Sequence, residues 1–179
     1  LIGYLYARVL QKEHQFDAAI KIATEVLVAE PNHSNSHLLL ANIYMTKGEF
    51  TAAKGHCTAL IGQVSLITVS TCVLDVQSQQ EQLIQSYNAL KKITHNKNIS
   101  LATAHVLSEM SYRLNNYQTA LSYISYVDLQ SAPVSLIVLW ADTQLAHNNT
   151  QQVLNTLAGL LTDNSNLEDA ILLRLAIAE

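Results

Sequence analysis

The chain has 179 residues, a net charge of −4 and a pI near 5.9, and 49% of its residues are hydrophobic. This acidic balance argues against nucleic-acid binding, which needs a clustered basic face. No apolar run reaches the roughly 18 residues of a membrane span. With 5 Gly and 2 Pro, there is little room for strands joined by tight turns. Because Ala and Leu are frequent and favour helices, the composition predicts an all-α protein.

The strongest pattern in the sequence is a repeat of about 34 residues. Residues of one kind recur at spacings of 34, 33, 34 and 33 in several columns. One column of mostly small residues contains Ala19, Ala53, Ser86, Ala120 and Val153. A second column contains Ala7, Ala41, Leu74, Ser108 and Ala141. A fixed period of this length is typical of arrays of stacked units. Such arrays present a surface more often than they build a catalytic pocket.

The first repeat predicts two amphipathic helices joined by a short polar turn. Apolar residues at helical spacing indicate one helix over residues 1–12 and a second that begins at Phe16. The second helix ends before Pro31, since proline cannot continue a helix. A lone pair of this kind buries only one face, so neighbouring copies must stack to complete the core.

The later repeats follow the same plan with different turn residues. Gly48 forms the turn of the second repeat, and Glu81 stands in its place in the third, between helices expected over residues 66–78 and 81–93. Asn115–Asn116 and Asn148–Asn149 mark the turns of the fourth and fifth, because Asn tolerates left-handed backbone. The predicted repeats are 1–33, 34–64, 65–97, 98–133 and 134–166, with a partial repeat at 167–179.

The second repeat resembles a tetratricopeptide repeat. The residues that carry the resemblance are Leu40–Ala41, Tyr44, Gly48, Phe50, Ala53, Cys57 and Leu60. The chain resembles this family from end to end as a single array over residues 1–179. The resemblance implies a right-handed α-solenoid of stacked antiparallel helix pairs, with five pairs plus one extra helix. Both ends fall inside the repeat pattern, so we expect a fragment of a longer chain.

The two cysteines fall on neighbouring repeats. Cys57 lies in the second helix of the second repeat and Cys72 in the first helix of the third. These helices should be adjacent and antiparallel, so either a disulfide or two half-buried thiols would fit. A disulfide implies an oxidising compartment. The pair also resembles one in uncharacterised bacterial envelope proteins of tetratricopeptide type. We therefore expect a periplasmic or cell-envelope location, with the cytoplasm as the alternative.

No catalytic or metal-binding constellation is evident in the sequence. It lacks a glycine-rich phosphate loop, an HExxH motif and a G-x-S-x-G motif. His33 and His37 are four residues apart, but zinc would need further ligands, and Asn35 and His56 complete no recognisable set. We expect a surface pair of histidines, no metal, no cofactor and no enzymatic activity.

Family resemblance also implies where a partner would bind. In this family the first helices of the pairs line a concave groove that holds peptides or protein segments. The positions carried over to this sequence are Tyr4, Arg8, Asn42, Met45, Asp75, His105, Glu109, Tyr112, Arg113 and Asp142. Interface hot spots favour aromatic residues and arginine, which makes Tyr4, Arg8, Tyr112 and Arg113 the leading candidates.

These patterns predict a non-catalytic scaffold for a protein or peptide partner, with no nucleic acid and no membrane span, in the bacterial envelope. One alternative is a cytosolic adaptor or regulator with reduced thiols, which the thiol state would distinguish. Another is the docking region of an enzyme whose catalytic domain lies outside this sequence, which the flanking sequence would reveal.

Overall fold

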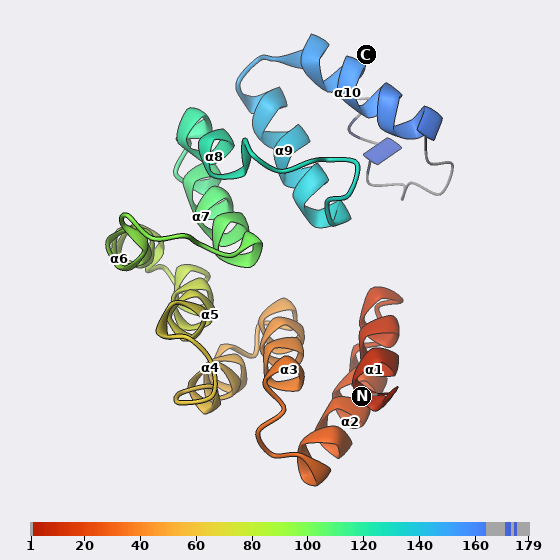
Figure 1. The fold of residues 1–179 in the computed structure, drawn as a ribbon, viewed down its shortest axis with the longest axis vertical. Coiled ribbons are helices and arrows are strands. Elements are labelled where there is room, and N and C mark those ends of the chain that lie inside the picture. Colours follow the sequence, from red (N-terminus) through yellow and green to blue (C-terminus); the bar gives the residue numbers. More distant parts are fainter. Residues whose placement is uncertain (1, 164–170, 173, 175–179) are drawn as a thin grey trace. The chain divides into compact units, whose positions relative to one another are not determined.

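The computed structural model describes residues 2–163, 171, 172 and 174, and these residues contain helices joined by turns and no strand (Figure 1). The chain divides into two compact units, the N-terminal unit Leu1–Lys97 and the C-terminal unit Asn98–Glu179. The predicted extra helix from residue 167 onward lies largely outside the described residues. None of the described helices combines the length and apolarity that a bilayer crossing requires.

Each unit is built from consecutive helix pairs, in agreement with the all-α prediction. The N-terminal unit contains α1 (Ile2–Lys12), α2 (Phe16–Ala29), α3 (Ser34–Thr46), α4 (Phe50–Ala59), α5 (Leu66–Ser78) and α6 (Leu83–Thr94). The C-terminal unit contains α7 (Leu101–Arg113), α8 (Tyr117–Ile124), α9 (Val134–Ala146) and α10 (Thr150–Asp163). The helix predicted over residues 66–78 is confirmed, whereas α6 begins two residues later than expected because Glu81 has a positive φ.

The turn inside every pair has a residue with left-handed backbone at the same position of the repeat. The residues with positive φ at this position are His14 (58°), Gly48 (76°), Glu81 (63°), Asn115 (58°) and Asn148 (61°), at the spacing of the repeat. The next amide closes the helix end: Glu49 N lies 2.8 Å from Tyr44 O, and Asn116 N lies 2.9 Å from Ser111 O. This is the bond that ends a helix in a Schellman motif. The turn therefore keeps its left-handed backbone at one position although the residue there changes.

The column of mostly small residues predicted from the repeat forms the seam between the helices of each pair. All of its members are at most 1% exposed: Ala19, Ala53, Ser86, Ala120 and Val153. Their small size lets the two helices approach closely. The third pair departs from the others, since the buried Ser86 hydroxyl has no hydrogen-bond partner.

Within each unit the first helices of the pairs lie closer together than the second helices. Helix α1 contacts α3, α3 contacts α5, and α7 contacts α9. The second helices α2 and α4, α4 and α6, and α8 and α10 make no comparable contact among the described residues. The first helices therefore form the inner layer of each stack, which is the side that curves inward.

Candidate functional site

All ten predicted groove residues lie on first helices. The N-terminal unit contributes Tyr4 and Arg8 from α1, Asn42 and Met45 from α3, and Asp75 from α5. The C-terminal unit contributes His105, Glu109, Tyr112 and Arg113 from α7, and Asp142 from α9. Each set is considered within its own unit.

On α1, an aromatic residue and an arginine support one another. The half-buried Tyr4 ring lies 5.3 Å from the His33 ring, centroid to centroid. The guanidinium carbon of the exposed Arg8 lies 5.8 Å from the centroid of Tyr4, within the range of a cation–π contact. Tyr4 is thus fixed in place while part of its surface and the Arg8 charge stay accessible.

The groove residues of α3 and α5 are more engaged in the fold. Gln11 on α1 donates a hydrogen bond from Nε2 to Oδ1 of Asn42, which connects neighbouring first helices. Met45 packs against the buried cluster that contains Ala41 and Val76. Asp75 is half-buried on α5. These side chains therefore contribute to the stack as well as to its inner surface.

Helix α7 brings several groove residues onto one face. His105, Glu109 and Tyr112 are spaced by four and three residues, which places them on the same side of a helix. Burial lowers the pKa of His105, and the Glu109 charge opposes that shift. Burial also raises the pKa of Tyr112, helped by the Asp142 charge. At neutral pH this face thus presents a neutral imidazole and a neutral phenol.

Asp142 does not act alone in the C-terminal unit, because it is paired with Arg174. Arg174 Nε lies 2.8 Å from Asp142 Oδ1, and Nη2 lies 2.9 Å from Oδ2. This two-bond geometry is the strongest form of such a pair, and it raises the pKa of Arg174. Sequence reasoning missed Arg174, although it comes 32 residues after Asp142 and so nearly continues the repeat column.

Comparison with known proteins agrees with this architecture. A tetratricopeptide repeat family model matches residues 10–63, which span α2 to α4 and their flanks. The chain carries tetratricopeptide repeats. A comparison with curated protein sequences found no match.

Two solved tetratricopeptide structures superpose on nearly the whole chain. A thermophilic tetratricopeptide protein from Thermus thermophilus has a TM-score of 0.78 at 13% identity, covering 98% of this chain and 96% of its own. A tetratricopeptide repeat protein from Parabacteroides merdae has a TM-score of 0.74 at 13% identity, covering 99% of this chain and 70% of its own. At such low identity the likeness shows the fold alone, and it supports the predicted stack of antiparallel helix pairs.

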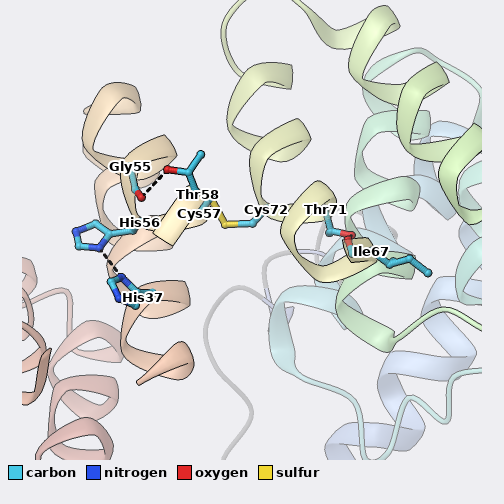
Figure 2. The surroundings of a disulfide bond; sticks show 8 residues. All are labelled: His37, Gly55, His56, Cys57, Thr58, Ile67, Thr71 and Cys72. Atoms are coloured by element: carbon cyan, nitrogen blue, oxygen red, sulfur yellow. Dashed lines mark hydrogen bonds between the residues drawn. A yellow bond between two sulfur atoms is a disulfide. The ribbon is translucent and has the colours of Figure 1, made fainter. Parts of the chain in front are cut away.

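In the tetratricopeptide stack of the N-terminal unit, a disulfide joins two neighbouring pairs. Cys57 on α4 and Cys72 on α5 are bonded, with their Cα atoms 5.5 Å apart (Figure 2). Cys57 is fully buried and Cys72 is half-buried. Of the two arrangements open from the sequence, the structure contains the bonded one, and it leaves no thiol to act as a nucleophile.

A histidine pair lies beside this disulfide, on α3 and α4 (Figure 2). His37 Nδ1 is 3.0 Å from His56 Nδ1, and His37 Nε2 is 3.0 Å from the Pro31 carbonyl oxygen. Since a carbonyl only accepts, His37 Nε2 carries a hydrogen, and one proton lies between the two Nδ1 atoms. Tyr44 stacks on His56 with ring centroids 5.5 Å apart.

The predicted surface pair of His33 and His37 is therefore wrong. His37 is only 9% exposed and bonds to His56, whereas His33 Nδ1 accepts from the Ser36 amide at 3.2 Å and caps α3. The two rings have separate structural partners because one precedes the helix and the other lies within it. Across the part of the chain that the structure describes, no group of three or more His, Cys, Asp or Glu side chains is arranged to hold a metal ion.

Proposed function

We propose that this tetratricopeptide chain is a non-catalytic interaction module that binds a peptide or protein segment along its first helices. Tetratricopeptide repeats generally mediate protein–protein interactions. The observation that carries the proposal is the inner layer formed by the first helices of each unit. The Gln11–Asn42 hydrogen bond bridges the neighbouring first helices α1 and α3, and in the C-terminal unit Arg174 binds Asp142 of the first helix α9. A segment lying across the layer would therefore contact several repeats at once.

The C-terminal unit offers the more defined contact site. Tyr112 is half-buried against the cluster that contains Trp140, and its ring lies 5.8 Å from that of Tyr117. Next to it, the Asp142–Arg174 pair is charged but nearly neutral overall. A partner that packs an apolar side chain on Tyr112 and places a polar group beside the ion pair fits this surface, because rigid aromatic anchors surrounded by polar groups are typical of binding hot spots.

We test this proposal by selecting binders from a displayed peptide library on the immobilised chain. Tyr112→Ala and Arg113→Ala should each weaken binding of the selected peptides by about tenfold or more, the loss expected for a hot-spot residue. Tyr126→Ala is the matched control, since Tyr126 is 62% exposed outside the first helices. Circular dichroism confirms that each variant is folded. Equal affinity of the selected peptides for the wild type and both α7 variants would remove the groove proposal.

We also propose that the protein works in an oxidising compartment, the periplasm or cell envelope of a bacterium. The support is the disulfide between Cys57 and Cys72, since such bonds persist in oxidising compartments and are rare in the cytosol. Thiols are trapped with an alkylating reagent at lysis, and the intact mass is then measured. An unalkylated oxidised chain is expected. Two alkylated cysteines would instead favour a cytoplasmic adaptor.

A further inference from the structure

The start of α3 is fixed by two histidines that each use a ring nitrogen as a hydrogen-bond acceptor. His33 Nδ1 accepts from the Ser36 amide at 3.2 Å and so caps the helix. His37 donates from Nε2 to the Pro31 carbonyl oxygen at 3.0 Å, which leaves its Nδ1 to accept from His56 Nδ1 at 3.0 Å (Figure 2). These contacts tie the α2–α3 connection to α3, and α3 to α4.

Both acceptor contacts require neutral imidazole rings. A protonated histidine carries a hydrogen on each ring nitrogen and has no acceptor left. Protonation of His33 therefore removes the helix cap, and protonation of His37 turns its contact with His56 into two donors that face each other. His33 and His37 also lie at the N-terminal end of α3, where the helix dipole opposes a positive charge. Acid thus acts against both contacts at the same place.

The surroundings of these rings do not compensate a positive charge. Tyr4 of α1 faces His33, and Tyr44 of α3 stacks on His56, with ring centroids 5.3 and 5.5 Å apart. Among the described residues, no carboxylate from α1, α2, α4 or α5 bonds to any of the three rings. Burial, and then the neighbouring His37, lower the pKa of His56. The closed arrangement therefore favours neutral rings.

The connection that these histidines hold is open to solvent. A hollow of about 570 Å³ is lined by residues 30–35, so water reaches His33 and can deliver a proton to it. Glu30 belongs to the same lining, and the Arg8 guanidinium lies 5.8 Å from the centroid of the Tyr4 ring. The charged groups on the two sides of His33 thus have opposite signs, and neither is bonded to its ring.

We propose that the start of α3 is a pH-sensitive switch, in which protonation of His33 and His37 releases the α2–α3 connection from α3 and α4. The release is local, since Gln63 Nε2 still bonds to Asn32 Oδ1 at 3.1 Å and amides do not titrate. Because His33 also supports the Tyr4 ring, the same event loosens a groove residue of α1. The switch is a property of the fold, and its test needs no partner.

Hydrogen exchange at the start of α3 tests the switch on the whole chain. The amides of Ser36 and His37 both bond to His33 and report whether the first turn is closed. Their exchange is measured at about pH 7.5 and about pH 5.5, relative to the rate of an unfolded chain at the same pH. Protection should fall about tenfold for each proton that opening takes up, since the lower pH is about one unit below the ordinary histidine pKa. Equal protection at both pH values would overturn the proposal.

A double variant removes the titration and keeps the contacts. In His33→Asn/His37→Gln, the asparagine oxygen replaces Nδ1 as the helix cap, and the glutamine amide replaces Nε2 as the donor to Pro31. The start of α3 should then be equally protected at both pH values. His95→Gln changes an exposed histidine of the same unit and should leave the acid effect intact. An acid effect as large in the double variant as in the wild type would contradict the switch.

Nitrogen NMR of the histidine rings in the wild type keeps the test decisive if the double variant folds poorly. At neutral pH, His33 and His37 should be neutral rings with the hydrogen on Nε2 and none on Nδ1. As the pH falls, both should become imidazolium together with the loss of protection at the Ser36 amide. A protonated His37 ring in a chain whose Ser36 and His37 amides stay protected would overturn the proposal.

Discussion

The two compact units connect their helix pairs by different means. In the N-terminal unit, the Cys57–Cys72 disulfide ties α4 to α5, and a neutral hydrogen bond links Gln11 to Asn42. In the C-terminal unit, Arg174 forms an ion pair with Asp142 of α9. Other residues of α9, including Leu136 and Trp140, belong to a buried apolar cluster.

This difference follows the quality of the repeat in each unit. The third pair is the one with a serine where other pairs have a small apolar residue or valine, and the disulfide anchors that pair to its predecessor. The C-terminal unit contains no cysteine, and its helix α9 buries Leu136, Leu139 and Trp140. A weak repeat is thus held by a covalent link and a strong one by apolar burial.

The largest expected effect comes from removing the disulfide. Cys57→Ala/Cys72→Ala should lower the free energy of unfolding of the N-terminal unit by about 3 kcal/mol, the loop-entropy value for a 15-residue closure. Hydrogen exchange in mild denaturant measures each unit separately, and the C-terminal unit should change little. Reductant should reproduce the loss in the wild type and have no effect on the variant. Equal losses in both units would contradict the comparison.

The ion pair should matter next, and only in the C-terminal unit. Asp142→Asn should cost about 1.5 kcal/mol at low salt, because Arg174 loses its charged acceptor in a partly buried site. The cost should shrink in high salt, which screens charges. Asn42→Ala, the matched change in the N-terminal unit, removes an exposed neutral bond and should cost about 0.5 kcal/mol at any salt concentration. Urea unfolding at two salt concentrations distinguishes the two behaviours.

Replacing a buried serine by alanine should change the stability of the two units in opposite directions. Ser86→Ala should stabilise the N-terminal unit by about 1 kcal/mol, since it removes a buried hydroxyl that has no partner. Ser108→Ala should destabilise the C-terminal unit by about 1 kcal/mol, since Ser108 Oγ donates to the Ala120 carbonyl at 2.9 Å. Thermal unfolding of the two variants measures both changes. A loss of stability in Ser86→Ala would show that this hydroxyl has an unrecognised role.

The smallest effect concerns acid sensitivity. Burial, and then the neighbouring His37, lower the pKa of His56, so the folded state prefers the neutral ring. This contribution to stability is complete above the ordinary histidine pKa of about 6.5 and is lost as the pH falls below it. His56→Gln should flatten the pH dependence of the N-terminal unit. The pH dependence of the C-terminal unit should not change in this variant, because it comes from His105, whose pKa burial lowers as well.

Urea unfolding at about pH 7.5 and about pH 5.5, on either side of the histidine pKa, measures this effect. His147→Gln changes an exposed histidine of the C-terminal unit and serves as the control. If His56→Gln left the acid sensitivity of the N-terminal unit unchanged, the His37–His56 pair would not be the source of that sensitivity.

The features that the sequence predicted depend on local backbone and side-chain requirements that recur in each repeat. Left-handed turns were predicted at Gly48 and Asn115, and both residues have a positive φ. Ala19 and Ala53 belong to the column of mostly small residues that the repeat marks, and both are buried at the seam, where small residues let two helices approach closely. The tetratricopeptide resemblance then placed the groove residues on first helices.

Features that the sequence did not predict depend on side chains meeting across helices. His37 and His56 are 19 residues apart, and their contact is set by how α4 packs on α3. Arg174 binds Asp142, which precedes it by 32 residues. Because this spacing is shorter than the repeat of 33 or 34 residues, the columns of the repeat did not pair the two residues. Pairwise contacts of this kind require the register and the rotamers of two helices at once, which periodicity alone does not contain.

The most direct test of the central claim is to map a selected peptide on the chain. A library-selected peptide carrying a photoreactive group is cross-linked to the protein, and the adducts are located by mass spectrometry. Binding to the inner layer predicts adducts on α7 and α9, around Tyr112 and Asp142, and their loss in Tyr112→Ala. Adducts confined to the second helices α8 and α10 would contradict the claim that the first helices form the partner-binding surface.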